Sequence, residues 1–141
     1  MTQAVNPRLI DAESIRLLKH ELRTPVNHIV GYSELLAEAA ADAGEEELTR
    51  AARTMHEGGC ALAELFEKHW STSAEEMDLS QMNALGKAIL PTVQRIEEEA
   101  SVAARITSSD ACAADVGRIR QAIHRLTTIQ ELGLIPSLRR T

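Results

Sequence analysis

Aromatic side chains are nearly absent from this chain of 141 residues, which has one tryptophan, one tyrosine and one phenylalanine. Strand-like alternation of β-branched and aromatic residues is absent too, whereas hydrophobic residues, rich in alanine and leucine, make up 44% of the sequence. This composition argues against a β protein and favours an all-α helix bundle with small core side chains. The length suffices for a single helical core of modest size.

Cysteine and long apolar runs are also scarce. Cys60 and Cys112 are too few and too far apart for a disulfide framework or a zinc site, and we expect each to be a small buried or half-buried residue within a helix. No apolar run approaches the roughly 18 residues that span a bilayer. The first residues lack the basic and apolar regions of a signal peptide. We therefore expect a soluble, cytoplasmic protein without membrane contact.

The charge balance and the histidine spacing argue against two classes of ligand, nucleic acids and metal ions. A net charge of -6 argues against nucleic acid, and the lack of aromatics removes the stacking platforms that single strands require. The arginines near the end of the chain are predicted to form a solvated face. They are Arg118, Arg120, Arg125, Arg139 and Arg140. The scattered histidines His56, His69 and His124 lack ligand spacing, so neither a metal nor a cofactor is expected.

The first half of the chain has the pattern of a helical hairpin. Apolar residues at alternating spacings of three and four predict a long helix that ends near residues 42–44, where Gly44 permits a left-handed cap. A second helix then repeats the pattern. The first apolar stripe is Ile15, Leu18, Leu22, Pro25, Ile29, Tyr32, Leu36 and Ala39, and the second is Leu48, Ala52, Met55, Gly59, Leu62, Phe66 and His69.

The second half predicts another hairpin, which divides the chain into residues 1–70 and 71–141. Residues 71–76 are expected to be a break with capping residues or a polar first turn of the next helix. The third helix either kinks or restarts at Pro91. Residues 107–110 form a capping cluster, and Gly133 and Pro136 end the fourth helix. The third stripe is Leu79, Met82, Gly86, Ile89, Val93, Ile96, Ala100 and Ala103, and the fourth is Val116, Ile119, Ile123 and Leu126.

The prolines of the first and third helices suggest a test for internal repetition. Aligning Pro25 with Pro91 places Gly86 opposite His20, and the two prolines then differ in their relation to the apolar stripes. This alignment excludes a second reactive histidine and leaves an ancient duplication open.

His20 is predicted to lie on the outer face of the first helix. At about 100° per residue, its side chain points away from the buried stripe, and Arg23, Thr24, Asn27 and Gly31 fall near the same outward line. A histidine in this position can be reached by another protein.

The residues around His20 resemble a known motif. The run is Leu18-Lys19-His20-Glu21-Leu22-Arg23-Thr24-Pro25-Val26-Asn27-His28, followed by Gly31-Tyr32-Ser33-Glu34-Leu35. It resembles the phosphoacceptor motif of the dimerisation and phosphoacceptor domain of two-component sensor histidine kinases. The resemblance covers roughly residues 10–70. It implies an antiparallel four-helix bundle in which two hairpins from two protomers associate, and hence a homodimer.

The resemblance and the chemistry of the side chains together assign roles. By resemblance, His20 is the phosphorylated residue, Glu21 the acidic neighbour that assists transfer, and Thr24 the residue implicated in dephosphorylating the partner. A neutral imidazole is a competent nucleophile, and a carboxylate can accept the proton of its second nitrogen. Arg23 supplies positive charge for the modified group. Pro25 leaves the Glu21 carbonyl unpaired and is expected to bend the helix, and Asn27 is a supporting residue on the outward line.

The rest of the chain departs from a complete sensor kinase. Nothing after residue 70 resembles the ATP-binding domain, because glycine-rich motifs and strand patterns are absent. The chain is therefore not expected to phosphorylate itself, and it either receives phosphate from another chain or is a piece of a larger protein.

Three interpretations remain open. The first is a phosphotransfer module whose His20 exchanges phosphate with a response-regulator receiver domain or a separate kinase domain. The second is a dimerisation or regulatory module that has lost the reaction. The third is a monomeric four-helix scaffold in which the second hairpin packs on the first.

Overall fold

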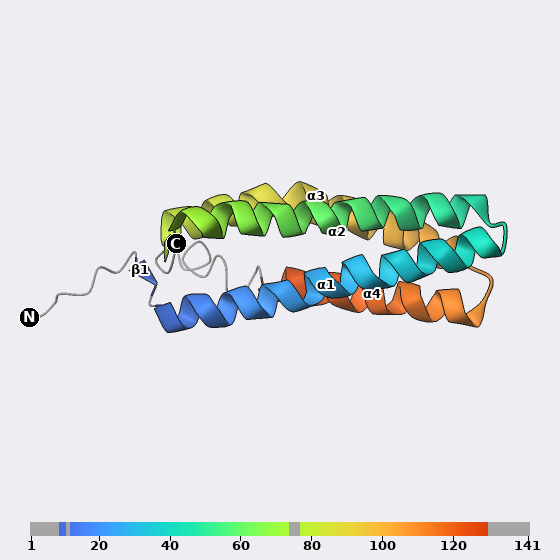
Figure 1. The fold of residues 1–141 in the computed structure, drawn as a ribbon, viewed down its shortest axis with the longest axis horizontal. Helices are drawn as coiled ribbons and strands as arrows, with labels where there is room; N and C mark the ends of the chain where they lie inside the picture. The colour runs from blue at the N-terminus through green and yellow to red at the C-terminus, as the bar shows by residue number, and fades with distance from the viewer. Residues whose placement is uncertain (1–8, 11, 74–76, 130–141) are drawn as a thin grey trace, which may run out of the picture.

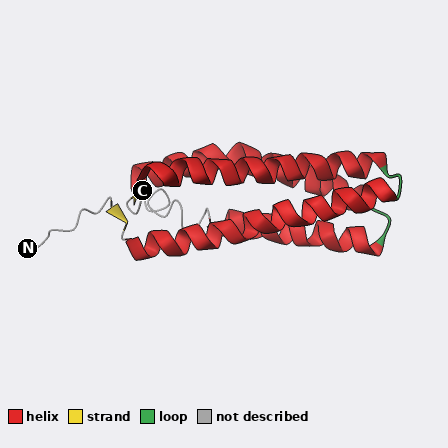
Figure 2. Cartoon of the chain, viewed as in Figure 1, coloured by secondary structure: helices red, strands yellow, loops and turns green. Residues whose placement is uncertain are grey.

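The computed structural model describes residues 9–10, 12–73 and 77–129, and it is a bundle of four helices (Figure 1). The helices are α1 (Ala12–Asp42), α2 (Glu46–Ser73), α3 (Leu79–Ile106) and α4 (Asp110–Ile129). Two very short strands, β1 (Leu9–Ile10) and β2 (Met77–Asp78), pair antiparallel with Leu9 opposite Asp78. Helix dominates the described chain (Figure 2), and the all-α prediction is confirmed.

The four helices form an antiparallel square. Short turns join α1 to α2 and α3 to α4 at the same end of the bundle (Figure 1). α1 packs against α2 and α4, while α3 packs against the same two helices from the opposite corner. The second hairpin of the chain thus covers the faces of the first. Within the described ranges no helix is long and apolar enough to cross a membrane.

One core runs through the middle of all four helices. Most members of the predicted stripes are buried in it, and this part of the prediction is confirmed. In α1, however, Leu18, Tyr32 and Ala39 are half-buried, whereas Val26 and Ala40, which lay outside the stripe, are fully buried. The buried arc of α1 is wider than a two-helix stripe because α1 faces two neighbours, α2 and α4.

The end of α1 follows the prediction closely. Gly44 has φ of 74°, the left-handed conformation that glycine adopts without a Cβ penalty. Its amide donates to the carbonyl of Ala41 at 3.1 Å, and the amide of Glu45 donates to Ala40 at 2.9 Å. This pair of bonds is a Schellman cap, and it reverses the chain into α2.

The start of α4 is capped by the side chain of Ser109. Its hydroxyl accepts a hydrogen bond from the amide of Cys112 at 3.1 Å. The predicted capping cluster is therefore confirmed at this residue. The turn before it approaches the α1–α2 turn, where the Ser108 hydroxyl donates to the Glu45 carboxylate at 3.4 Å.

Other expectations about the helices meet different outcomes. α3 continues through Pro91, so it does not restart there, and Pro91 is exposed whereas Pro25 is buried. α2 runs to Ser73, beyond the start of the expected break. The rest of the break, at residues 74–76, and the end expected at Gly133 and Pro136 lie outside the described residues. The division of the chain at residue 70 stays a prediction.

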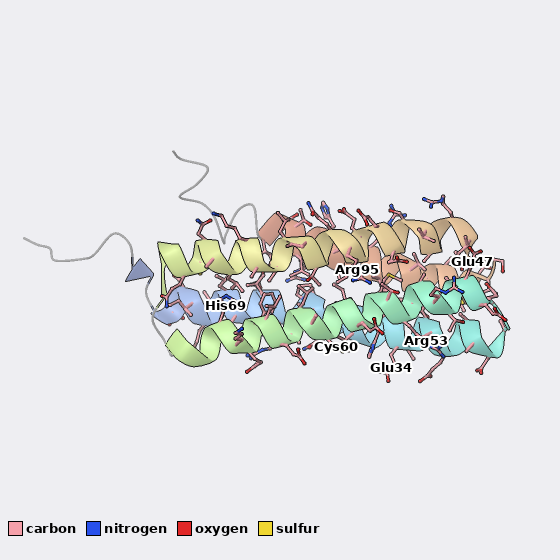
Figure 3. All side chains as sticks on the ribbon, turned by 90° about the horizontal axis from the view of Figure 1, so that it is seen from above. Glu34, Glu47, Arg53, Cys60, His69 and Arg95 are labelled. Carbon is pink, nitrogen blue, oxygen red and sulfur yellow. The ribbon has the colours of Figure 1, made fainter. Side chains whose placement is uncertain are left out.

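The two cysteines differ in their exposure to solvent. Cys112 is buried in the core, as predicted, but Cys60 is exposed on α2 (Figure 3), so the prediction of a buried or half-buried side chain is wrong there. Cys60 follows the buried Gly59 by one residue. A step of about 100° carries its side chain out of the core-facing arc.

The buried positions of the two hairpins correspond to each other. In α1, Ile15, Leu22, Val26, Ile29 and Leu36 have the same spacing as Met82, Ile89, Val93, Ile96 and Ala103 in α3. In α2, Leu48, Ala52, Met55 and Leu62 have the same spacing as Cys112, Val116, Ile119 and Leu126 in α4. In this register exposed Lys87 stands where His20 stands in α1. Aligning the prolines is therefore off by one residue, but the exclusion of a second reactive histidine is unaffected.

Candidate functional site

His20 lies on the outer face of α1, in the half of the helix farther from the capped turn, and it is exposed. Leu22, two residues on, is completely buried. The helix therefore presents its core side and its histidine in opposite directions, as the sequence predicted. Glu21 and Arg23 are exposed on either side of His20, and each joins α1 to a different neighbouring helix.

The Arg23 side chain reaches toward α2. Its Nη2 atom lies 3.4 Å from Oε2 of Glu67, and both side chains are more than half exposed. At the opposite edge, α1 supplies the acidic side chain and the neighbouring helix α4 supplies the arginine. There Oε1 of Glu21 lies 3.5 Å from Nη2 of Arg125 in α4. His20 thus stands on the ridge of α1 between two inter-helix ion pairs, one with each adjacent helix.

Thr24 lies one helical turn beyond His20 and is half-buried. Its hydroxyl donates a hydrogen bond to the main-chain carbonyl of His20 at 3.1 Å. The hydroxyl donates to the backbone in this structure. The dephosphorylating role that the resemblance implies for Thr24 would use the oxygen lone pairs or a rotation of the side chain.

Pro25 and Asn27 complete the set of predicted residues. Pro25 is buried within α1, which continues through it as one helix. Asn27 is exposed and opens on a shallow hollow along the outer face of α1. The hollow is lined also by His28, Gly31, Tyr32, Glu34, Leu35 and Glu38.

The α4 arginines are exposed, as predicted, and two of them also contact α1. The Arg118 guanidinium lies 5.4 Å from the centroid of the Tyr32 ring, a cation–π arrangement. Tyr32 also meets the His28 ring edge-on, with ring centroids 5.9 Å apart. α4 therefore contacts the outer edge of α1 at two levels, through Arg118 and through Arg125.

The remaining titratable side chains do not gather into a second centre. Among the described residues, no group of three or more histidine, cysteine or acidic side chains could hold a metal ion. The His69 ring contacts the carbonyl of Leu65 at 2.9 Å (Figure 3), and Cys60 Sγ lies 3.9 Å from Nε2 of His56. These contacts are local, between residues one helical turn apart.

Sequence reasoning missed Glu67, and it did not predict that Arg125 contacts Glu21. The sequence does show that α1 has both acidic and basic side chains near His20 and that α2 and α4 have side chains of the opposite charge. It contains no signal for the register at which α2 and α4 pack on α1, however, and only this register brings Glu67 to Arg23 and Arg125 to Glu21.

Comparison with known proteins gives one match. Residues 12–68, which span most of α1 and α2 and include His20, match the family model "His Kinase A (phospho-acceptor) domain". The comparisons with curated proteins and with solved structures gave no match. Residues 12–68 of this chain are therefore similar to the phosphoacceptor domain of histidine kinases.

Proposed function

We propose that this chain accepts a phosphoryl group on His20 and passes it on. The donor is either ATP held by a histidine-kinase catalytic domain in another chain or the phosphorylated receiver aspartate of a response regulator. The acceptor is a receiver aspartate. The observation that carries the proposal is the exposure of His20 on the ridge of α1, inside the residues that match the phosphoacceptor family. A partner's active site can approach it without disturbing the core.

The transfer step follows from the chemistry of imidazole. One ring nitrogen of His20 attacks phosphorus with its lone pair, so that an N–P bond forms and the P–O bond to the donor breaks. The electron pair of the broken bond leaves with the donor oxygen, on an aspartate carboxylate or a nucleoside diphosphate. The proton on the second ring nitrogen passes to or is shared with the Glu21 carboxylate.

The neighbouring residues take supporting roles in this proposal. Arg23 offers positive charge to a group that carries about two negative charges at neutral pH. Thr24 assists the return of the phosphoryl group or its hydrolysis. Pro25, which cannot donate to the Glu21 carbonyl, bends α1 next to the reactive residue. Asn27 lies on the approach of the partner.

The assembly around His20 is a separate question. The resemblance implies a domain that dimerises and acts with kinase and response-regulator domains. The homodimer expected from the resemblance stays a prediction. The packing of α3 and α4 on α2 and α1 supports the monomeric alternative, because the second hairpin occupies the faces through which a second copy would associate.

Phosphoryl transfer gives a direct test of the proposal. We would incubate the chain with a phosphorylated receiver domain or with an active histidine-kinase catalytic domain and ATP, and measure acid-labile phosphate on the chain. Label is expected on the wild type and on His28→Ala, which removes another exposed histidine of α1, and is expected to be absent from His20→Ala. Label that persists in His20→Ala would overturn the assignment.

The second candidate is a regulatory module that keeps the fold without the reaction. In this candidate the Thr24 hydroxyl keeps its hydrogen bond to the His20 carbonyl and takes no part in phosphate chemistry. Absence of label with every donor tested, in a chain that folds normally by circular dichroism, would replace the first proposal with this one.

A further inference from the structure

Arg125 belongs to α4, outside the residues that match the phosphoacceptor family, yet it reaches the residue next to His20. Its Nη2 atom lies 3.5 Å from Oε1 of Glu21, and the two side chains are 51% and 49% exposed. Because Glu21 directly follows His20 in α1, the guanidinium group stands at the edge of the ridge that carries the histidine.

The pair is confined to the reactive side of the bundle. In the register that superimposes the buried positions of the two hairpins, Glu21 corresponds to Ala88 of α3 and Arg125 corresponds to Ala61 of α2. The equivalent edge between α3 and α2 therefore holds two alanines. An ion pair that only held neighbouring helices together would be equally useful at both edges, but among these described positions it occurs only at the edge next to His20.

Because the ion pair is exposed, Arg125 can exchange the Glu21 carboxylate for another anionic partner at little cost in stability. Solvent screens an ion pair of this kind, so it contributes little to stability. A phosphoryl group on His20 brings about two negative charges, against one on Glu21. The planar guanidinium group also matches the oxygens of a phosphoryl group with two parallel donors. Arg125 can therefore leave Glu21 as a phosphoryl group arrives.

We propose that Arg125 is a phosphoryl-binding residue of the His20 site, supplied by the second hairpin. As the N–P bond forms, its guanidinium group moves from the Glu21 carboxylate to the phosphoryl oxygens, and Glu21 becomes available for the imidazole proton. This inference rests on the proposed function of His20. It assigns α4 a part in the reaction that the matched residues 12–68 do not contain.

The rate of phosphoryl acceptance from a phosphorylated receiver domain tests the inference. Arg125→Gln is expected to lower the rate by about fivefold, the effect of one exposed charge contact, and Arg125→Lys is expected to restore part of it. Arg120→Gln is the matched control, since Arg120 is an exposed arginine of the same helix. It makes the same change in charge and is expected to react at the wild-type rate. Equal melting temperatures of the two glutamine variants would exclude a loss of fold.

A second comparison separates direct contact from an effect through Glu21. In a Glu21→Gln background, Arg125→Gln is expected to lower the rate again, because the arginine meets the phosphoryl group itself. If it has no further effect in that background, or if it equals Arg120→Gln in the wild-type background, the inference is wrong. An unlabelled wild-type chain would instead overturn the proposed function, and this inference with it.

Discussion

At the scale of single residues, the accessibility of His20 is a consequence of helix geometry. The core takes Leu22, Val26 and Ile29 from α1, and the opposite side of the same helix must then face solvent. Only residues within one or two turns are needed for this argument. For that reason the outward position of His20 could be predicted from the sequence, whereas its charged neighbours on α2 and α4 could not.

Gly44 is the residue whose replacement tests the turn between α1 and α2. Its φ of 74° is strained for any residue with a Cβ, so Gly44→Ala is expected to lower the free energy of unfolding by about 1–2 kcal/mol. The measurement is urea unfolding followed by circular dichroism.

Gly117 is the control for Gly44, because the same substitution by alanine is expected to stabilise the protein there. It is an exposed residue within α4, and a Cβ added there would meet nothing within 4 Å. Gly117→Ala is therefore expected to raise the free energy of unfolding by about 0.5–1 kcal/mol, because alanine loses less backbone entropy in a helix. If Gly44→Ala and Gly117→Ala changed the free energy of unfolding equally, Gly44 would not be in the left-handed conformation.

At the scale of helices and their ends, local signals were reliable. The Schellman cap after α1 and the Ser109 cap before α4 both occur where the sequence places glycine and a capping cluster. The fate of Pro91 was less predictable. Both α1 and α3 continue through a proline, which is buried in α1 and exposed in α3, so burial of the proline does not decide whether the helix continues.

Ser109→Ala tests the cap of α4. Loss of the hydroxyl leaves the Cys112 amide without its side-chain acceptor, and we expect a loss of about 1 kcal/mol in unfolding free energy. The adjacent Ser108→Ala is the control, because Ser108 contacts Glu45 only at the exposed surface. A larger effect from Ser108→Ala than from Ser109→Ala would show that the cap is wrongly assigned.

The close approach of α2 and α3 is tested at Gly58. A Cβ added there would lie 2.6 Å from Cγ1 of Ile96, so Gly58→Ala is expected to destabilise the bundle by about 1–2 kcal/mol, after the helix preference of alanine is deducted. The contact disappears in Ile96→Ala. The double variant should therefore be more stable than the sum of the two single effects predicts. Strict additivity would mean that the two helices do not meet at these residues.

At the scale of the whole molecule, the two hairpins form one bundle with a single core. Their buried positions coincide in register, but His20 corresponds to Lys87. The second hairpin therefore resembles the first in packing and not in chemistry. One bundle carries one candidate acceptor, whereas a dimer of identical hairpins would carry two.

The mass in solution distinguishes the two assemblies. Because α3 and α4 already cover α2 and α1, we expect a monomer of 15.4 kDa with a melting temperature independent of protein concentration. The measurements are light scattering coupled to size exclusion, and thermal unfolding across a wide range of concentrations. Twice this mass, together with a melting temperature that rises with concentration, would contradict this expectation and favour the homodimer that the resemblance implies.

The sequence by itself determined the helical class, the cap residues, most of the buried stripes and the outward direction of His20. Each of these depends on residues within a few positions along one helix. The tertiary structure decided that the second hairpin packs on the first, that Val26 and Ala40 join the core, and that Glu67 and Arg125 flank the histidine. Those contacts depend on the register between helices, which is set by the side chains of both partners and leaves no pattern in either helix alone.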